Sequence, residues 1–204
     1  MKPRVLIGGG EIKNRETEHI DKCCITLTKK KNPVVVFIPI AAFDSEEYAK
    51  TFEQYYTSLN AKVIIAFISK EHKKSVLDKI SACDIVYLSG GDTEQLINQF
   101  KKNPEFIEAI KKKIVVGMSA GALALSQKCL ISKDEDTPKT KIVEGLGLID
   151  FTTEVHFDGN ATEILKVIKN QTVFAIAEKS CIVIEEKSRQ YIGNVKVFLK
   201  DETA

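Results

Sequence analysis

The sequence predicts a three-layer α/β/α sandwich with a mainly parallel central sheet and a C-terminal antiparallel hairpin. Between Val5 and Leu125, short apolar runs of strand length alternate with amphipathic stretches of helix length. The runs are apolar throughout, as strands are when helices cover both faces of a parallel sheet. The end of the chain instead alternates apolar and polar residues around a polar turn, which is typical of antiparallel strands.

Strands and intervening helices account for the first part of the chain. The predicted strands span residues 5–7, 34–38, 63–68, 84–88 and 114–116. The predicted helices lie around residues 20–27 and at about 45–59, 72–80, 93–100 and 104–112. Right-handed crossovers between parallel strands then place these helices on both faces of the sheet.

The pattern changes after Leu125. A polar segment at residues 133–141 is followed by a strand-like run ending near His156, a helix at about 161–169 and a strand at 173–177. Residues 181–200 predict a hairpin or meander with a turn near 187–190. Because no Pro-, Gly- or Ser-rich linker divides the chain, we expect one domain over residues 1–204.

Composition and charge narrow the class of protein. The 30 basic and 28 acidic residues leave a net charge of +2, so charge predicts no binding to nucleic acid or membranes. Lysine triplets at 29–31 and 111–113 follow predicted helices, where cations interact well with helix C-termini. Five cysteines without CxxC spacing predict free thiols in a reducing compartment. With no secretory signal or bilayer-length apolar run, the expected location is the cytoplasm.

Four informative turns of this sequence lie where predicted parallel strands end. GGG follows the first strand, PIAAFDS the second, SGGDT the fourth and GMSAG the fifth. In open α/β sheets the carboxyl ends of the strands meet at the ligand crevice. These loops are therefore expected to converge on one site.

Ser119 is the candidate nucleophile. It stands between two glycines in GMSAG, at the junction of an apolar strand and a run of small residues. A sharp strand-to-helix turn there holds the serine in a strained conformation and exposes its hydroxyl, as in a nucleophile elbow. A serine hydroxyl needs a base to accept its proton and a third group to orient the base.

His156 is the candidate base, since it ends a strand-like run beside a glycine-containing loop. The other histidines, His19 and His72, lie in polar helical stretches and are expected to face solvent. The orienting acid stays open among five carboxylates, which either follow Ser119 in the polar loop or lie near strand ends: Asp134, Glu135, Asp136, Asp158 and Glu178.

Backbone amides are the candidates for an oxyanion hole. The amide of Ala120 directly follows the candidate nucleophile at a helix N-terminus, and a second donor is expected from Gly90 or Gly91. In the same turn, Gly90 and Asp92 are candidate substrate-binding residues, although Asp92 or Thr93 can equally serve as a helix N-cap.

The ordered set GGG, FIPIAA, YLSGGDTEQL, VGMSAGALAL, GLGLIDF and EVHF resembles the aspartyl dipeptidase (peptidase E) family of serine peptidases. The wider group includes cyanophycinase and shares the class I glutamine amidotransferase-like fold. The resemblance covers about residues 5–184, and SGGDT followed by GxSAGA is much more specific than GxSxG alone.

The resemblance implies hydrolysis of a peptide bond by a serine nucleophile, with no metal or organic cofactor. Ser119 matches the nucleophile and His156 the base, while Gly91 and Ala120 match the oxyanion amides. Asp134 falls where aspartyl dipeptidase places its third triad member.

The acid and the substrate preference are the two points at which this chain departs from the family pattern. Cyanophycinase-type enzymes use a later glutamate as the acid, and Glu178 resembles it here. An Asp-X dipeptide is the expected substrate, yet no arginine lies in a presumed site loop, which leaves Lys133 and Lys139 as candidates to bind the aspartate.

A scaffold of this kind can carry other functions. A glutamine amidotransferase is disfavoured because that chemistry uses cysteine at the elbow, although His156 and Asp158 imitate its His-x-acid pair. An α/β-hydrolase esterase shares GxSxG but places its acid and histidine in a larger chain. A non-catalytic protein that binds peptides or small molecules is the alternative from another class. The C-terminal tail leaves monomer and homodimer both open.

Overall fold

A computed structural model describes residues 1–39, 45–131, 140–166 and 171–200 of the chain. Its central sheet has seven strands in the order β11-β10-β1-β5-β4-β2-β3. The strands are β1 (Arg4–Ile7), β2 (Val34–Ile38), β3 (Lys62–Ile65), β4 (Ile85–Leu88), β5 (Ile114–Met118), β10 (Cys181–Ile184) and β11 (Arg189–Ile192). The first five are mutually parallel, whereas β10 and β11 form an antiparallel hairpin at one edge.

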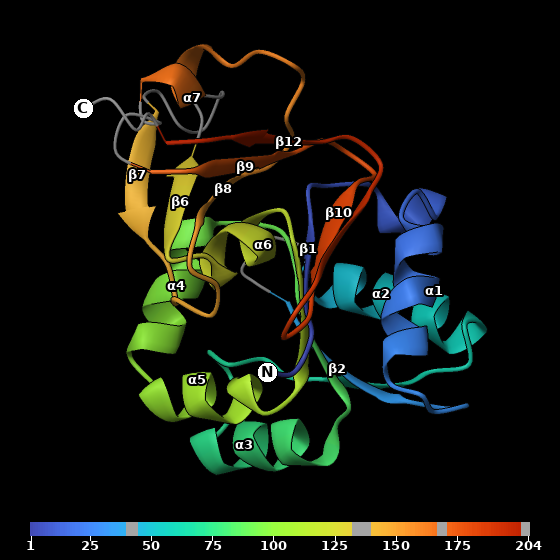
Figure 1. The fold of residues 1–204 in the computed structure, drawn as a ribbon. Coiled ribbons are helices and arrows are strands. Elements are labelled where there is room, and N and C mark those ends of the chain that lie inside the picture. Colours follow the sequence, from blue (N-terminus) through green and yellow to red (C-terminus); the bar gives the residue numbers. More distant parts are fainter. Residues whose placement is uncertain (40–44, 132–139, 167–170, 201–204) are drawn as a thin grey trace.

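Helices cover both faces of this sheet, as Figure 1 shows, and this confirms the predicted α/β architecture. They are α1 (Glu18–Leu27), α2 (Ser45–Ser58), α3 (Lys73–Ala82), α4 (Thr93–Lys101), α5 (Pro104–Lys111), α6 (Ala120–Leu125) and the short 3₁₀-helix η1 (Ile12–Asn14). Successive residues of a strand point to opposite faces, so Val35 and Phe37 pack with α1 and α2. Val36 and Ile38 pack with α3, α4 and α5.

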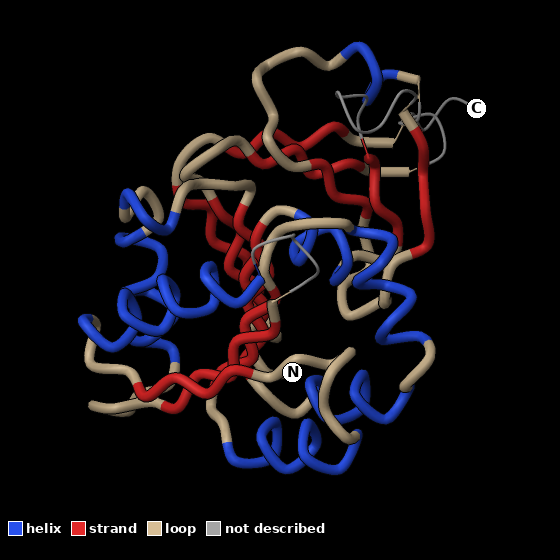
Figure 2. Tube along the Cα trace, turned by 180° about the vertical axis from the view of Figure 1, so that it is seen from behind, coloured by secondary structure: helices blue, strands red, loops and turns tan. Residues whose placement is uncertain are grey.

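A second sheet of five strands lies above the first in Figure 1, and the sequence did not predict it. Its order is β12-β9-β8-β6-β7, from β6 (Lys128–Ile131), β7 (Lys141–Glu144), β8 (Thr152–Glu154), β9 (Val173–Ile176) and β12 (Val195–Phe198). Only the 173–177 strand, the strand-like run before His156 and the tail were expected to be extended. The predicted meander is corrected too, because β12 leaves the hairpin and pairs with β9. In the view from behind, the second sheet again caps one end of the main sheet (Figure 2).

The predicted helix at 161–169 is α7 (Thr162–Leu165) in the described part of the chain. All five cysteines are free and four of them are buried, as predicted. Burial raises the pKa of the Cys83 thiol to about 11, which keeps it protonated and unreactive near neutral pH.

Among the described residues, no helix has the length and apolar character needed to cross a bilayer.

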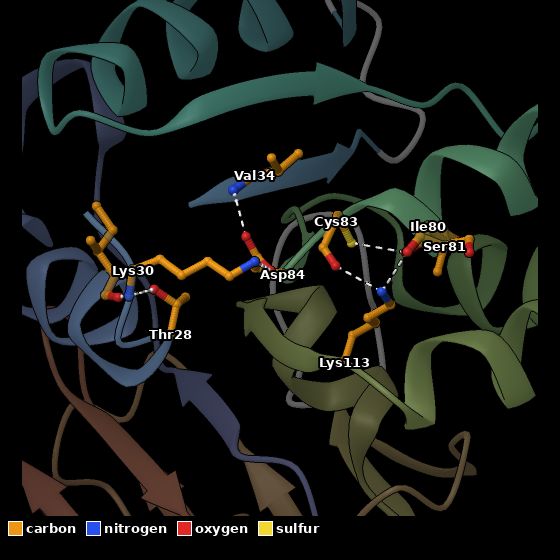
Figure 3. A network of polar contacts seen from close by, with 9 residues as sticks. Thr28, Lys30, Val34, Ile80, Ser81, Cys83, Asp84 and Lys113 are labelled. Atoms are coloured by element: carbon orange, nitrogen blue, oxygen red, sulfur yellow. Dashed lines mark hydrogen bonds and ion pairs between the residues drawn. The ribbon is translucent and has the colours of Figure 1, made fainter. Parts of the chain in front are cut away.

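The amino end of the sheet is tied together by polar contacts, which Figure 3 shows. Asp84, directly before β4, accepts a hydrogen bond from the Val34 amide at 2.9 Å and pairs with Lys30 at 2.7 Å. Lys113 Nζ donates to the carbonyls of Ser81 and Cys83 at the end of α3, at 2.7 and 2.8 Å. Lysines of both triplets therefore bind where helices and strands meet, and Lys113 binds the carboxyl end of α3, not that of α5, the helix it follows.

Candidate active site

Ser119 follows β5 directly and precedes the first residue of α6. Its backbone has φ 51° and ψ −115°, a conformation that a residue with a side chain adopts only at a cost. The Ser119 amide donates to the carbonyl of Ile7 on β1 at 2.9 Å, and its carbonyl accepts from Leu123 at 3.0 Å. The sharp strand-to-helix turn inferred from GMSAG is therefore present.

Small residues allow this turn to form. All of α6 is buried, and it packs against β4 and β5. A Cβ on Gly121 would collide with the carbonyl oxygen of Leu88 on β4, so the helix reaches this position only because the residue is glycine. The close packing of α6 holds Ser119 in its strained conformation.

His156 comes to Ser119 from the second sheet, two residues after the end of β8. Its Nε2 lies 2.7 Å from Ser119 Oγ, and its backbone amide donates to the carbonyl of Gly8 at 3.0 Å. The residue has φ 55°, so its backbone, like that of Ser119, is in an uncommon region. The side chain is 51% exposed, which leaves the imidazole accessible to a substrate.

Glu178 completes a chain of three side chains. It follows β9, the neighbour of β8, and its Oε1 forms a short hydrogen bond with His156 Nδ1. Because a carboxylate only accepts hydrogen bonds, Nδ1 carries the proton and Nε2 is left to accept the proton of the Ser119 hydroxyl. This is the nucleophile, base and orienting-acid arrangement of serine hydrolases.

Of the remaining candidate acids, Asp158 lies within the described residues. Asp134, Glu135 and Asp136 lie outside the described residues, as do Lys133 and Lys139. Asp158 accepts a hydrogen bond from the amide of Asn160 at 2.7 Å and caps its own turn. His19 and His72 are exposed on other parts of the fold, as expected from their polar surroundings.

The Gly90–Gly91 turn lies against the serine. A Cβ built on Gly90 would sit 3.5 Å from Ser119 Cβ and 3.8 Å from Oγ. Gly91 has φ 128°, and Ala120 is the first residue of α6, where amides have no partner within the helix. Asp92 Oδ1 accepts from the Gln95 amide at 2.9 Å, so this side chain caps α4.

Two ion pairs among the described residues involve positions close in sequence to site residues. Lys179, which follows Glu178, forms an ion pair with Glu16 at 2.8 Å. The hydrogen bond from Lys179 lowers the pKa of Glu16. Lys141 pairs with Glu94, three residues past Gly91. These two lysines, which the sequence analysis did not single out, are thus each matched by a carboxylate.

Comparisons with known proteins identify the family of this chain. The model of peptidase family S51 matches residues 5–192. The chain is 26% identical over 164 residues to the uncharacterized peptidase YgaJ of Bacillus subtilis (strain 168), covering 78% of this chain and 70% of that protein. It is 22% identical over 187 residues to peptidase E of Haemophilus influenzae (strain PittGG), covering 82% and 78%.

A solved structure shares the fold over nearly the whole length. The crystal structure of a peptidase from an acI-B1 Actinobacterium superposes with a TM-score of 0.70 at 19% identity, covering 99% of this chain and 96% of that one. The family match spans the strand-end turns and the segments carrying Ser119, His156 and Glu178. The chain therefore belongs to peptidase family S51 and is a serine peptidase.

Proposed function

We propose that this peptidase hydrolyses short peptides through an acyl-enzyme at Ser119, with His156 as the general base and Glu178 as the acid that orients it. The observation that carries the proposal is the unbroken chain of contacts from Glu178 Oε1 to His156 Nδ1 and from His156 Nε2 to Ser119 Oγ. Each member comes from a different strand end, so the fold, and not local sequence, sets the geometry.

The proposed reaction follows from the roles of these groups. Ser119 Oγ attacks the carbonyl carbon of the peptide bond while His156 Nε2 takes the hydroxyl proton. The amides of Ala120 and Gly91 stabilise the negative oxygen of the tetrahedral intermediate, and His156 then returns the proton to the leaving amine. Water, activated by the same imidazole, hydrolyses the ester and regenerates Ser119.

The proposed substrates are dipeptides and similarly short peptides, with Asp-X as the first to be tested. An N-terminal aspartate side chain needs a cation to bind it. Lys179 directly follows Glu178, and Lys141 is paired with Glu94, three residues past Gly91; both lysines are already ion-paired. Binding of an aspartate by either lysine would therefore require exchange with Glu16 or Glu94.

A panel of dipeptides tests this proposal, with Asp-Leu, Ala-Leu and β-Asp-Arg assayed against the wild type and Ser119→Ala. We expect hydrolysis of at least one dipeptide by the wild type and its loss in Ser119→Ala, with unchanged thermal unfolding. The preferred dipeptide separates an aspartyl-dipeptidase specificity from a cyanophycinase-like one. Equal hydrolysis by both proteins would overturn the serine mechanism. Cleavage of simple esters with no cleavage of peptides would favour an esterase instead.

A further inference from the structure

The end of β1 and the turn after it form backbone hydrogen bonds with all three segments that carry Ser119, His156 and Glu178. The carbonyl of Ile7 accepts the Ser119 amide at 2.9 Å, and the carbonyl of Gly8 accepts the His156 amide at 3.0 Å. The carbonyl of Gly9 accepts the amide of Lys179, the residue after Glu178, at 2.9 Å. Three consecutive carbonyls of one turn therefore set the backbone positions around the site.

Gly9 also lies against the reactive side chains themselves. A Cβ built on Gly9 would be 2.5 Å from Glu178 Oε1 and 2.6 Å from both Cε1 and Nδ1 of His156. These distances are far below van der Waals contact, and the atoms involved are the two partners of the His–Glu hydrogen bond. Gly9 has φ 152°, close to the edge of the region that favours glycine.

The other two glycines of the motif have different neighbours. A Cβ on Gly8 would meet the backbone carbonyls of Ile176 and Ala177, where β9 ends. Gly10 has φ 140°, similar to Gly9, but its Cβ would meet Thr17 Cγ2 at 2.7 Å. Of the three, only Gly9 has its nearest contacts with the His156 and Glu178 side chains.

We propose that Gly9 is a positioning residue for the His156–Glu178 pair, because the space left by its missing side chain is where the carboxylate meets the imidazole. The inference rests on the proposed function for its effect on catalysis. Glu178 is 48% exposed, and a Cβ on Gly9 would lie against the same Oε1 that meets His156 Nδ1. A methyl group on Gly9 must displace the carboxylate from Nδ1, or turn the imidazole away from Ser119.

Gly9→Ala is the test, and Gly10→Ala is its matched control because both residues have similar positive φ. A misplacement of a catalytic group by about 1 Å can cost on the order of 100-fold in rate. We expect Gly9→Ala to lower kcat by about that factor with little change in KM. Gly10→Ala is expected to keep most of the wild-type kcat. Equal losses in the two variants would show that backbone strain alone is responsible and would overturn the proposal.

A second measurement separates this proposal from the proposed function, since it needs no substrate. A proton held between His156 Nδ1 and a carboxylate gives a far-downfield proton NMR signal, which Glu178→Gln assigns by its disappearance. We expect the signal in the wild type and in Gly10→Ala, and its loss or marked shift in Gly9→Ala. An unchanged signal in Gly9→Ala would contradict the proposal even if the protein cleaved no peptide tested.

The double variant Gly9→Ala/Glu178→Ala covers the case in which Gly9→Ala folds poorly. Removing the Glu178 carboxylate removes the 2.5 Å collision and leaves space into which the His156 ring, 2.6 Å from the added Cβ, can move, so the double variant should unfold at a higher temperature than Gly9→Ala. If the single variant is unstable because of its backbone alone, the second substitution gives no recovery, and the proposal fails. A double-mutant cycle combines Gly9→Ala with Glu178→Gln. The fold-loss in kcat of the double variant should be smaller than the product of the two single fold-losses, because both substitutions disturb the same hydrogen bond.

Discussion

At the scale of single residues, Glu178 could be chosen as the proposed orienting acid only from the three-dimensional fold. Both Asp134 and Glu178 follow Ser119 in the sequence, one in a polar segment and one at a predicted strand end, so the sequence alone could not choose between them. Glu178 contacts His156 because β8 and β9 are parallel neighbours, with Glu154 opposite Ala175. His156 and Glu178 follow these paired residues by two and three positions, and so reach the same place.

The choice of acid gives a direct prediction. Glu178→Gln keeps the shape of the side chain but removes the charge that orients and stabilises the imidazole during proton transfer. We expect kcat to fall by roughly 10²- to 10⁴-fold. Asp134→Asn should retain nearly full activity, and steady-state kinetics on the preferred dipeptide compares the two. A larger loss of kcat in Asp134→Asn than in Glu178→Gln would identify Asp134 as the acid instead.

A second residue-scale prediction concerns Asp21, which is fully buried on α1. It accepts hydrogen bonds from Tyr56, Thr17 and Tyr55 at 2.6, 2.8 and 3.0 Å. Burial raises the pKa of this carboxyl, and the three hydroxyl hydrogen bonds only partly oppose the effect. Because the folded state holds this proton more tightly than the unfolded chain, ionisation of Asp21 reduces stability.

The sign of the pH dependence follows from that raised pKa. As pH rises above the unfolded value of about 3.9 towards the raised folded value, Asp21 lowers the free energy of unfolding. The side chain introduced by Asp21→Asn cannot ionise. In urea unfolding at a series of pH values, the variant should therefore lack the decrease in the free energy of unfolding that the ionisation of Asp21 causes in the wild type. Identical pH profiles for the variant and the wild type would rule out the effect.

At the scale of elements, the parallel strands and long helices could be predicted because their apolar periodicity is strong. The central α3 to α5 region agrees with the predicted ranges within about two residues. The second sheet escaped prediction for a physical reason: three of its strands, β7, β8 and β12, contain at most two consecutive apolar residues, and β7 is mostly exposed. Apolar runs this short carry little signal, and long-range pairing fixes the structure of these strands.

Asp84, directly before β4, binds Lys30 and the first residue of β2 at the amino end of the main sheet. One substitution at Asp84 therefore tests both contacts together. Burial raises the pKa of Asp84, but the hydrogen bonds from Lys30 and Val34 outweigh it and leave the pKa below its usual value. Asp84→Ala leaves the Val34 amide without its side-chain acceptor, which should cost about 1–3 kcal/mol in free energy of unfolding. Denaturant unfolding at neutral pH measures this loss.

The pH dependence of Asp84 has the opposite sign to that of Asp21. Its contribution is present above the unfolded pKa of about 3.9 and disappears as the pH falls through the lower folded value. The difference between wild type and Asp84→Ala should therefore shrink in acid. A difference that stays constant down to acid pH would show that the ionised carboxylate is not what stabilises this junction.

At the scale of the whole molecule, the site is built where two sheets meet. The main sheet supplies Ser119 and the turn after β1, while the second sheet supplies His156 and Glu178. The sequence located the serine because a parallel sheet predicts where its strand ends converge. The sequence also indicated His156, because this residue ends a strand-like run. The pairing of His156 with Glu178 depends on the second sheet, which the sequence did not predict.

We propose that Ser119, His156 and Glu178 act as one catalytic unit. Labelling with a fluorophosphonate probe, followed by intact-mass and peptide analysis, tests it most directly, because the probe reacts only with an activated serine. We predict one adduct per chain, located on Ser119, with none in Ser119→Ala and much slower labelling in Glu178→Gln. An unlabelled wild type would contradict the claim and favour a binding protein on the same scaffold.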